Sequence, residues 1–100
     1  MTTENFRVIQ CGDLETYTGA NGQQGNVRQL ILQQMGTYQN SAEQTQRLQN
    51  ALIVHTYGNL ALCQFYPGDI VVAAIRFEAK AGKDGRWWQD VSAADIVKIR

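Results

Sequence analysis

The sequence has 100 residues, a length that leaves no room for a second hydrophobic core. Of these residues 44% are hydrophobic and 18% charged, a composition that excludes a disordered chain. Nine basic residues balance nine acidic ones, so any affinity for nucleic acid must come from local clustering of cations. Because no apolar run approaches the ~20 residues that cross a bilayer and the N-terminus lacks a signal-peptide pattern, we expect one cytoplasmic domain over residues 1–100, without membrane contact.

The first third of the chain predicts two strands joined by a tight hairpin. Residues 6–18 begin with closely spaced apolar residues, and we expect one long, coiled strand that a bulge or bend interrupts at Gly12. Residues 19–25 hold three glycines and an Asn-Gly pair, which tolerate positive φ, so they predict a hairpin turn. Residues 27–35 form the second expected strand.

The middle of the chain leaves two alternatives open. Residues 38–50 are polar and rich in glutamine. They form either a short helix, with Ser41 and Gln44 as a capping box, or a long inter-strand loop. Residues 51–57 are dense in β-forming residues and predict a buried third strand.

A short helix and a turn separate the third strand from the fourth. The helix is expected over residues 60–65, with Asn59 as its N-cap, and the Tyr-Pro-Gly-Asp sequence at 66–69 is typical of a turn. Residues 70–80 alternate clearly and predict the fourth strand. One face of that strand carries Val71, Ala73, Ile75 and Phe77, and the other carries Arg76, Glu78 and Lys80.

The last strand completes a recognisable order of elements. A second glycine-containing turn at residues 81–85 leads into an extended stretch over residues 87–99, which we expect to bend at Ala93-Ala94. Three strands, a short helix and two further strands in about 100 residues are typical of the oligonucleotide-binding (OB) barrel. We therefore predict an all-β fold: a five-stranded OB-type barrel with a short helix between strands 3 and 4.

Short motifs mark the second half of the chain. They are Tyr57-Gly58 after the third strand, the segment 66–72 at the start of the fourth, the segment 84–91 at the start of the fifth, and Ala94-Asp95-Ile96 beyond it. Over residues 50–99 these motifs resemble the bacterial single-stranded-DNA-binding protein family and small relatives that share its barrel. The resemblance implies an OB barrel that binds single-stranded DNA. The glutamine-rich segment 38–50 departs from the lysines and aromatics that such a family places in a DNA-contacting loop.

The window from Arg76 to Trp88 carries most of the expected binding chemistry. It holds four of the nine basic residues and both tryptophans, and single-strand binding needs aromatic faces for bases beside cations for phosphates. Side chains alternate between the two faces of a strand, so Trp87 is expected to share the barrel side with Val91 and Trp88 to lie on the surface. The predicted nucleic-acid-binding residues are Trp88, Arg86, Lys83, Lys80, Arg76, Tyr57 and Arg28. A protein–protein contact, or no binding role at all, is the alternative for this window.

Two of these residues lie outside the window. Among the four tyrosines, Tyr57 is a stacking candidate if the third strand faces the ligand, whereas closing the barrel mouth is the commoner role for the others. Arg28, together with Arg7, extends a basic track across the first two strands; an ordinary solvated arginine is the alternative for each.

Catalysis has little support in the sequence. His55, the single histidine, lies in an apolar strand, where a core or half-buried histidine is commoner than a general base. Cys11 and Cys63 lie in apolar surroundings and are expected to be small buried hydrophobes. We expect neither catalysis, nor a metal site, nor a cofactor.

The predicted function is single-stranded nucleic-acid binding, with DNA favoured, by a domain that works as a homo-oligomer. The window's cations are expected to neutralise three or four phosphates, so the slope of log affinity against log salt should be about −2 to −3. The neutral net charge and the uncharged segment 38–50 motivate the alternative, an OB-fold protein-interaction or assembly module without nucleic-acid binding. A small-ligand or carbohydrate barrel is a third, weaker hypothesis.

Overall fold

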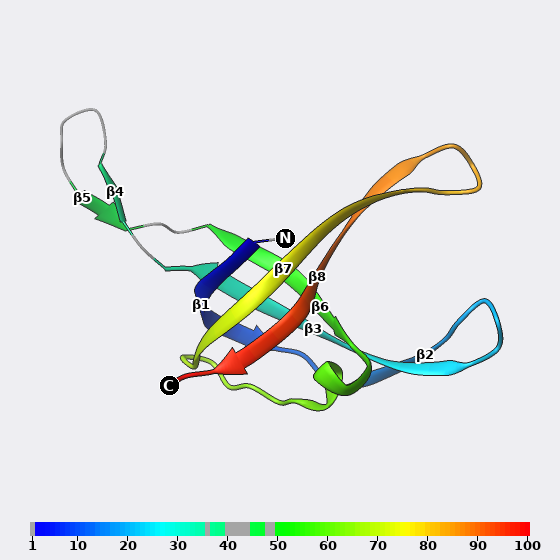
Figure 1. Ribbon diagram of the computed structural model, residues 1–100, viewed down its shortest axis with the longest axis horizontal. Coiled ribbons are helices and arrows are strands. Elements are labelled where there is room, and N and C mark those ends of the chain that lie inside the picture. The colour runs from blue at the N-terminus through cyan, green and yellow to red at the C-terminus, as the bar shows by residue number, and fades with distance from the viewer. Residues whose placement is uncertain (1, 36, 40–44, 48–49) are drawn as a thin grey trace.

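Strands make up most of the protein. The computed structural model describes residues 2–35, 37–39, 45–47 and 50–100. The strands and the single short 3₁₀ helix follow each other in the order β1 (Thr2–Cys11), β2 (Glu15–Thr18), β3 (Gln24–Gln34), β4 (Thr37–Gln39), β5 (Thr45–Arg47), β6 (Ala51–Tyr57), η1 (Gly58–Leu62), β7 (Ile70–Ala81) and β8 (Trp87–Lys98) (Figure 1). In the described part of the chain no helix is long and apolar enough to span a membrane.

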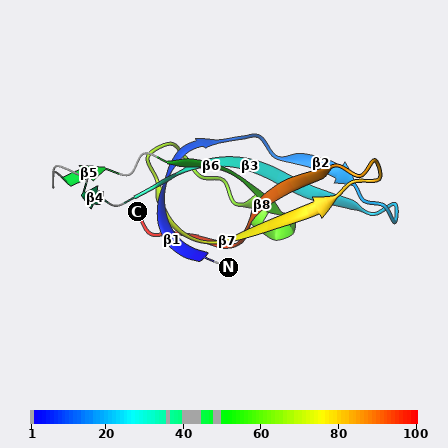
Figure 2. The same cartoon turned by 90° about the horizontal axis from the view of Figure 1, so that it is seen from above.

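Strand β1 closes the sheet into a barrel. Its first residues, Thr2 to Arg7, pair with β7, and its later residues, Phe6 to Cys11, pair with β3. A register shift between Val8 and Gln10 marks a bulge, which increases twist and lets the strand curve around the barrel (Figure 2). The ring then runs β1, β7, β8, β6 and β3, with β6 and β8 parallel at the pair His55–Ser92. The predicted five-stranded OB-type barrel is confirmed.

Apolar residues of the five barrel strands fill the barrel, together with Phe65 from the segment between η1 and β7. The buried cluster consists of Phe6, Val8, Leu30, Leu32, Val54, Phe65, Val71, Ala73, Ile75, Ala93 and Ile96. Ala93 and Ile96 are three residues apart, which a strict period of two does not allow. The pairing moves from Ala74–Asp95 to Ile75–Ala93 and leaves Ala94 unpaired, so the bend predicted at Ala93-Ala94 is a β-bulge that keeps both neighbours inside.

Two hairpins project from the same end of the barrel (Figure 1). We call them the β2–β3 arm, residues 15–27, and the β7–β8 arm, residues 77–91. Val71, Ala73 and Ile75 are buried as predicted, but Phe77 is 49% exposed although it continues their face of the strand. Trp87 was expected on the barrel side and is 72% exposed, so that assignment is wrong. Both residues lie on the arm beyond the end of the barrel, where neither face of the hairpin is covered.

Local structure differs from expectation in the first strand and the helix. The stretch 6–18 forms two strands, β1 and β2, separated at 12–14, because a Cβ at position 12 would lie 3.0 Å from the carbonyl oxygen of Gln29 and only glycine fits comfortably there. The helix expected over residues 60–65 is a 3₁₀ turn that begins two residues earlier, and its N-cap is Tyr57, with no side-chain capping bond from Asn59.

The glutamine-rich segment contains a hairpin. Strands β4 and β5 pair antiparallel, from Thr37–Arg47 to Gln39–Thr45, so its described residues are neither a helix nor an unpaired loop. Ser41 and Gln44, the expected capping box, lie outside the described residues.

Candidate nucleic-acid interface

The outer surface of β6 reaches both arms through Tyr57, which contacts Tyr17 of the β2–β3 arm and Asp90 of the β7–β8 arm. Val54 and Thr56 point into the barrel, so the alternation of the strand turns Ile53, His55 and Tyr57 outward. In the neighbouring strand β3, the residues paired with these three are Ile31, Gln29 and Val27. This surface therefore combines apolar and polar side chains on a rigid, hydrogen-bonded support.

Two tyrosines meet at the edge of this surface. Tyr17 of β2 and Tyr57 of β6 are both exposed, and their rings pack edge to face with centroids 6.1 Å apart. Tyr17 pairs with Gly25 across the β2–β3 arm, and a Cβ at position 25 would lie 2.6 Å from the Tyr17 ring. Glycine at this position therefore lets the Tyr17 ring lie flat over the backbone and holds it beside Tyr57.

The β7–β8 arm places a cation over an aromatic ring. Lys80 and Trp88 are directly opposed in the hairpin, and the Lys80 Nζ lies 5.6 Å from the centre of the Trp88 ring, within cation–π range. Trp88 is 53% exposed, as parity predicted. Both side chains are accessible to a ligand that follows this face of the arm.

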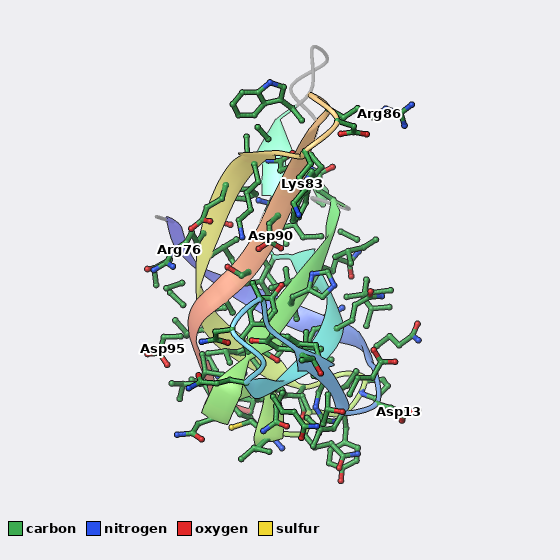
Figure 3. The ribbon with its side chains drawn as sticks, turned by 90° about the vertical axis from the view of Figure 1, so that its right-hand side faces the viewer. Asp13, Arg76, Lys83, Arg86, Asp90 and Asp95 are labelled. Atoms are coloured by element: carbon green, nitrogen blue, oxygen red, sulfur yellow. The ribbon has the colours of Figure 1, made fainter. Side chains whose placement is uncertain are left out.

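Asp90 connects the arm to the tyrosines. Its Oδ1 accepts a hydrogen bond from the Tyr57 hydroxyl at 3.5 Å and lies 3.9 Å from His55 Nδ1, while its Oδ2 lies 3.7 Å from Lys80 Nζ. Figure 3 shows Asp90 on β8, between the body of the barrel and the arm tip that carries Lys83 and Arg86. We call the resulting continuous series of side chains the outer strip: Tyr17, Tyr57, His55, Asp90, Lys80 and Trp88.

Burial and charge keep Tyr57 in its neutral form. Desolvation raises the pKa of Tyr57 above its ordinary value of 10.0, and the negative charge of Asp90, its hydrogen bond to Asp90 and the nearby Tyr17 raise it further. A tyrosine is already uncharged at neutral pH, and the raised pKa of Tyr57 extends this neutral range to more alkaline pH. An uncharged ring suits stacking against a base beside an anionic backbone.

Carboxylates offset most of the predicted cations. Lys80 Nζ lies 3.8 Å from Glu78, Arg76 lies 3.7 Å from the same carboxylate, and at the tip Arg86 lies 3.5 Å from Asp84. Arg76 is at the outer edge of β7 and points away from β6 (Figure 3). The strip is therefore rich in exposed aromatic rings but carries only a weak positive field.

Arg28 does not belong to this surface. It is 8% exposed, and its guanidinium donates hydrogen bonds from Nε to the carbonyl oxygen of Ala61 at 2.8 Å and from an Nη atom to that of Gly12 at 3.1 Å. The expectation of an exposed arginine is wrong, because Arg28 instead joins η1 to the break between β1 and β2. Arg7 is exposed on β1, where it pairs with Ile70 of β7.

The histidine and the two cysteines show no arrangement suited to catalysis or metal binding in the part of the chain that the structure describes. His55 is half-buried, as expected, with 34% of its side chain exposed. Cys11 is half-buried beside the core, whereas Cys63 is exposed, which corrects the expectation that it is buried. Within the described ranges, no group of three or more His, Cys, Asp or Glu is placed to hold a metal ion.

Sequence reasoning missed three members of the outer strip: Tyr17, His55 and Asp90. Asp90 lies two residues after Trp88, so strand parity alone indicated that both share a face. The glycine opposite Tyr17 was also a signal, since an aromatic residue often covers a glycine on the neighbouring strand. His55 carried no such signal, because its partner on β8 is 35 residues away in the chain.

Comparisons with known proteins agree on the fold. No protein-family model matches the sequence, and no curated protein matches it either. The structure resembles the second OB-fold domain of replication protein A from Methanococcus maripaludis, with a TM-score of 0.62 and 18% identity over 97% of this chain and 81% of that one. It also resembles the small single-stranded DNA-binding protein of Streptomyces coelicolor, with a TM-score of 0.57 and 16% identity over 98% and 92% of the two chains.

A third similar structure is the single-stranded DNA-binding protein of Thermus aquaticus. The TM-score is 0.65 and the identity 13%, over 98% of this chain and 49% of that one, so the chain spans about half the length of that protein. The resemblance to single-stranded-DNA-binding proteins drawn from the sequence is thus confirmed at the level of the OB fold.

Proposed function

We propose that this domain binds single-stranded nucleic acid, with DNA favoured, along the outer strip. The observation that carries the proposal is the series of exposed rings Tyr17, Tyr57 and Trp88, linked through Asp90 and Lys80, on the surface between two projecting arms. Successive bases stack on such rings while a lysine meets the phosphates between them. A duplex keeps its bases stacked on one another and has no comparable use for these rings.

The similar structures support DNA as the ligand. Two of them are described as single-stranded DNA-binding proteins, and each similarity covers 98% of this chain. The weak positive field of the outer strip supports binding that depends more on stacking than on ionic contacts. Stacking supplies most of the affinity and ionic contacts supply less, because each of Arg76, Lys80 and Arg86 has a carboxylate within 4 Å.

The test is a titration with a fluorescent single-stranded oligonucleotide of about 30 bases, beside its duplex form. We expect the single strand to bind and to quench part of the tryptophan emission, and the duplex to bind far more weakly. No quenching and no binding at low ionic strength, by a protein shown to be folded, would overturn the proposal.

One observation favours the second candidate, a protein-interaction or assembly module. Phe77 and Trp87 are exposed on the other face of the β7–β8 arm, and an exposed apolar surface of this kind is typical of protein contacts. Light scattering at increasing concentration tests self-association, and Trp87→Ala should reduce it if the arm is the contact. A monomer at all concentrations would exclude the homo-oligomer that we propose alongside binding.

The remaining parts of the proposal concern domain organisation, catalysis and cellular compartment. We propose a single non-catalytic domain over residues 1–100 that acts in the cytoplasm without cofactor or metal. The two free thiols Cys11 and Cys63 support a reducing compartment.

A further inference from the structure

His55 has an unsatisfied nitrogen inside the proposed interface. Its Nδ1 atom is buried and has no hydrogen-bond partner, although most buried polar atoms in proteins have one. Asp90 Oδ1 lies 3.9 Å from this atom, a distance too long for a hydrogen bond but one that a small rotation of either side chain would shorten. A protonated imidazole carries N–H donors on both nitrogens, so protonation would give Nδ1 a donor that faces a carboxylate.

The surroundings of His55 make Asp90 its main charged neighbour. Strand β8 contributes Asp90 and the paired Ser92, and β3 contributes the uncharged Gln29 opposite. Tyr57 of the same strand lies 6.2 Å away between ring centroids, with Tyr17 of β2 behind it. The charged side chains of β7 are linked to Asp90 by a series of ion pairs. Lys80 lies beside Asp90, Glu78 lies beside Lys80, and Arg76 lies beside Glu78.

Asp90 is shared between His55 and Lys80. Its Oδ1 faces the imidazole and its Oδ2 faces the ammonium group, which in turn lies over Trp88. With His55 neutral, Lys80 is held by two carboxylates, Asp90 and Glu78. With His55 protonated, the imidazolium competes for Asp90, and Lys80 becomes available to a phosphate.

We infer that His55 and Asp90 form a proton-linked switch that controls the affinity of the outer strip for single-stranded nucleic acid. The inference rests on the proposed function and adds its regulation. Protonation of His55 adds one positive charge to the strip and weakens the hold of Asp90 on Lys80, and both changes favour a polyanion. Linkage is reciprocal, so the bound strand must in turn favour protonation of His55.

The direction of the pH effect follows from this linkage. Histidine ordinarily changes charge between about pH 5 and pH 8, and this chain contains a single histidine. Affinity should therefore rise as pH falls through that range. One proton limits the effect to tenfold per pH unit, and a charge in water-exposed surroundings gives less, so we expect about three- to tenfold tighter binding at about pH 5.5 than at about pH 8.

The experiment has two readouts, one of which needs no nucleic acid. The ring C–H signals of the single histidine are followed by NMR against pH in the free protein, in Asp90→Asn and in the presence of a (dT)-type oligonucleotide. We expect Asp90→Asn and the bound oligonucleotide each to change how these signals respond to pH, because both alter the charge that faces His55 Nδ1. The second readout is oligonucleotide affinity at the two pH values for the parent protein and for His55→Gln.

The outcomes separate the inference from the proposed function. In His55→Gln the ratio of affinities at the two pH values should fall to about one. An unchanged ratio in His55→Gln, or a pH response of the His55 signals unaffected by Asp90→Asn, overturns the switch even if the protein binds DNA. If no oligonucleotide binds at either pH, the proposed function fails. A changed pH response of the His55 signals in Asp90→Asn would then still show that His55 and Asp90 are coupled, but a switch on nucleic-acid affinity would be excluded.

Discussion

At the scale of single residues, Trp88 lies opposite Lys80 on one face of the β7–β8 hairpin, whereas Trp87 lies opposite Ala81 on the other. Only the face that carries Trp88 continues into the outer strip. Base–aromatic stacking is typically worth about 1–3 kcal/mol, so Trp88→Ala should weaken oligonucleotide affinity about 5- to 150-fold. Fluorescence anisotropy at constant salt measures this loss.

Trp87→Ala is the matched control for that variant. It removes an indole of the same size from the adjacent position, and Trp87 is the more exposed of the two. We expect a clearly smaller loss of affinity, with the binding-induced quenching of Trp88 retained. Equal losses of affinity in the two variants would contradict binding of the oligonucleotide along one face of the arm. They would indicate instead that the oligonucleotide wraps around the arm.

Gly25 provides a second test at this scale. In Gly25→Ala the new methyl group would lie 2.6 Å from the Tyr17 ring, so the ring must swing away from its place beside Tyr57. Because the ring is a movable side chain, we expect a stability loss of about 1 kcal/mol or less, together with weaker oligonucleotide binding. Urea unfolding and anisotropy measure the two effects separately.

Gly19→Ala is the control within the same arm, since a Cβ there would meet its nearest atom, Asn21 Oδ1, at 3.3 Å and does not approach Tyr17. Its oligonucleotide affinity should stay close to that of the parent protein. If Gly25→Ala binds as well as Gly19→Ala, Tyr17 does not take part in binding.

At the scale of elements, Arg28 connects parts of the fold that are distant in sequence. Its side chain on β3 bonds the carbonyl of Ala61 in η1 and that of Gly12 after β1. In Arg28→Met both carbonyls lose their partner. An unsatisfied buried group costs about 1–3 kcal/mol, and the bond to the Gly12 carbonyl is only partly buried and so contributes less, so we expect the free energy of unfolding to fall by about 2–4 kcal/mol. Urea denaturation measures this change.

Arg28→Met also separates a structural role from a binding role. The fraction of the variant that remains folded should bind oligonucleotide with the salt dependence of the parent protein. A stable variant with a shallower salt slope would show instead that Arg28 meets a phosphate, contrary to its burial.

Elements with strong local chemistry were predicted well. The Asn-Gly turn of the β2–β3 arm, the Pro-Gly turn before β7 and the Gly turn of the β7–β8 arm carry positive φ at Gly22, Gly68 and Gly85. Strand β6 has the predicted bounds, and the bulge lies at the predicted Ala93-Ala94. The failures involve non-local contacts: the end of β1 depends on the approach of Gln29 to Gly12, and η1 is held by Arg28.

At the scale of the whole molecule, the small net charge of the binding region should show in its salt dependence. The stretch 76–90, which extends the window as far as Asp90, contains four cations, Arg76, Lys80, Lys83 and Arg86, against the three carboxylates of Glu78, Asp84 and Asp90, a net charge of +1. At about −0.7 per neutralised phosphate, we expect a slope of log affinity against log salt between about −0.7 and −1.5. This is shallower than the sequence alone predicts, because the structure pairs most of these cations with carboxylates.

Affinity measured between low and moderate salt tests this slope. Lys83→Ala should reduce its magnitude by a little under one unit, without changing base preference. A slope steeper than about −2 would mean that the bound strand displaces the carboxylates from Lys80, Arg76 and Arg86.

The sequence by itself determined the order of elements, the turns and the OB barrel, because alternation and turn residues act over a few neighbouring positions. It also indicated that Trp88 and Lys80 share a face in the window that we propose binds nucleic acid. Only the tertiary structure decided which side chains meet across strands: Tyr17 with Tyr57, and His55 with Asp90. It also decided which side chains are buried. Arg28 is buried and Trp87 is exposed because one lies within the barrel and the other beyond its end. The position of that end depends on how all the strands pair.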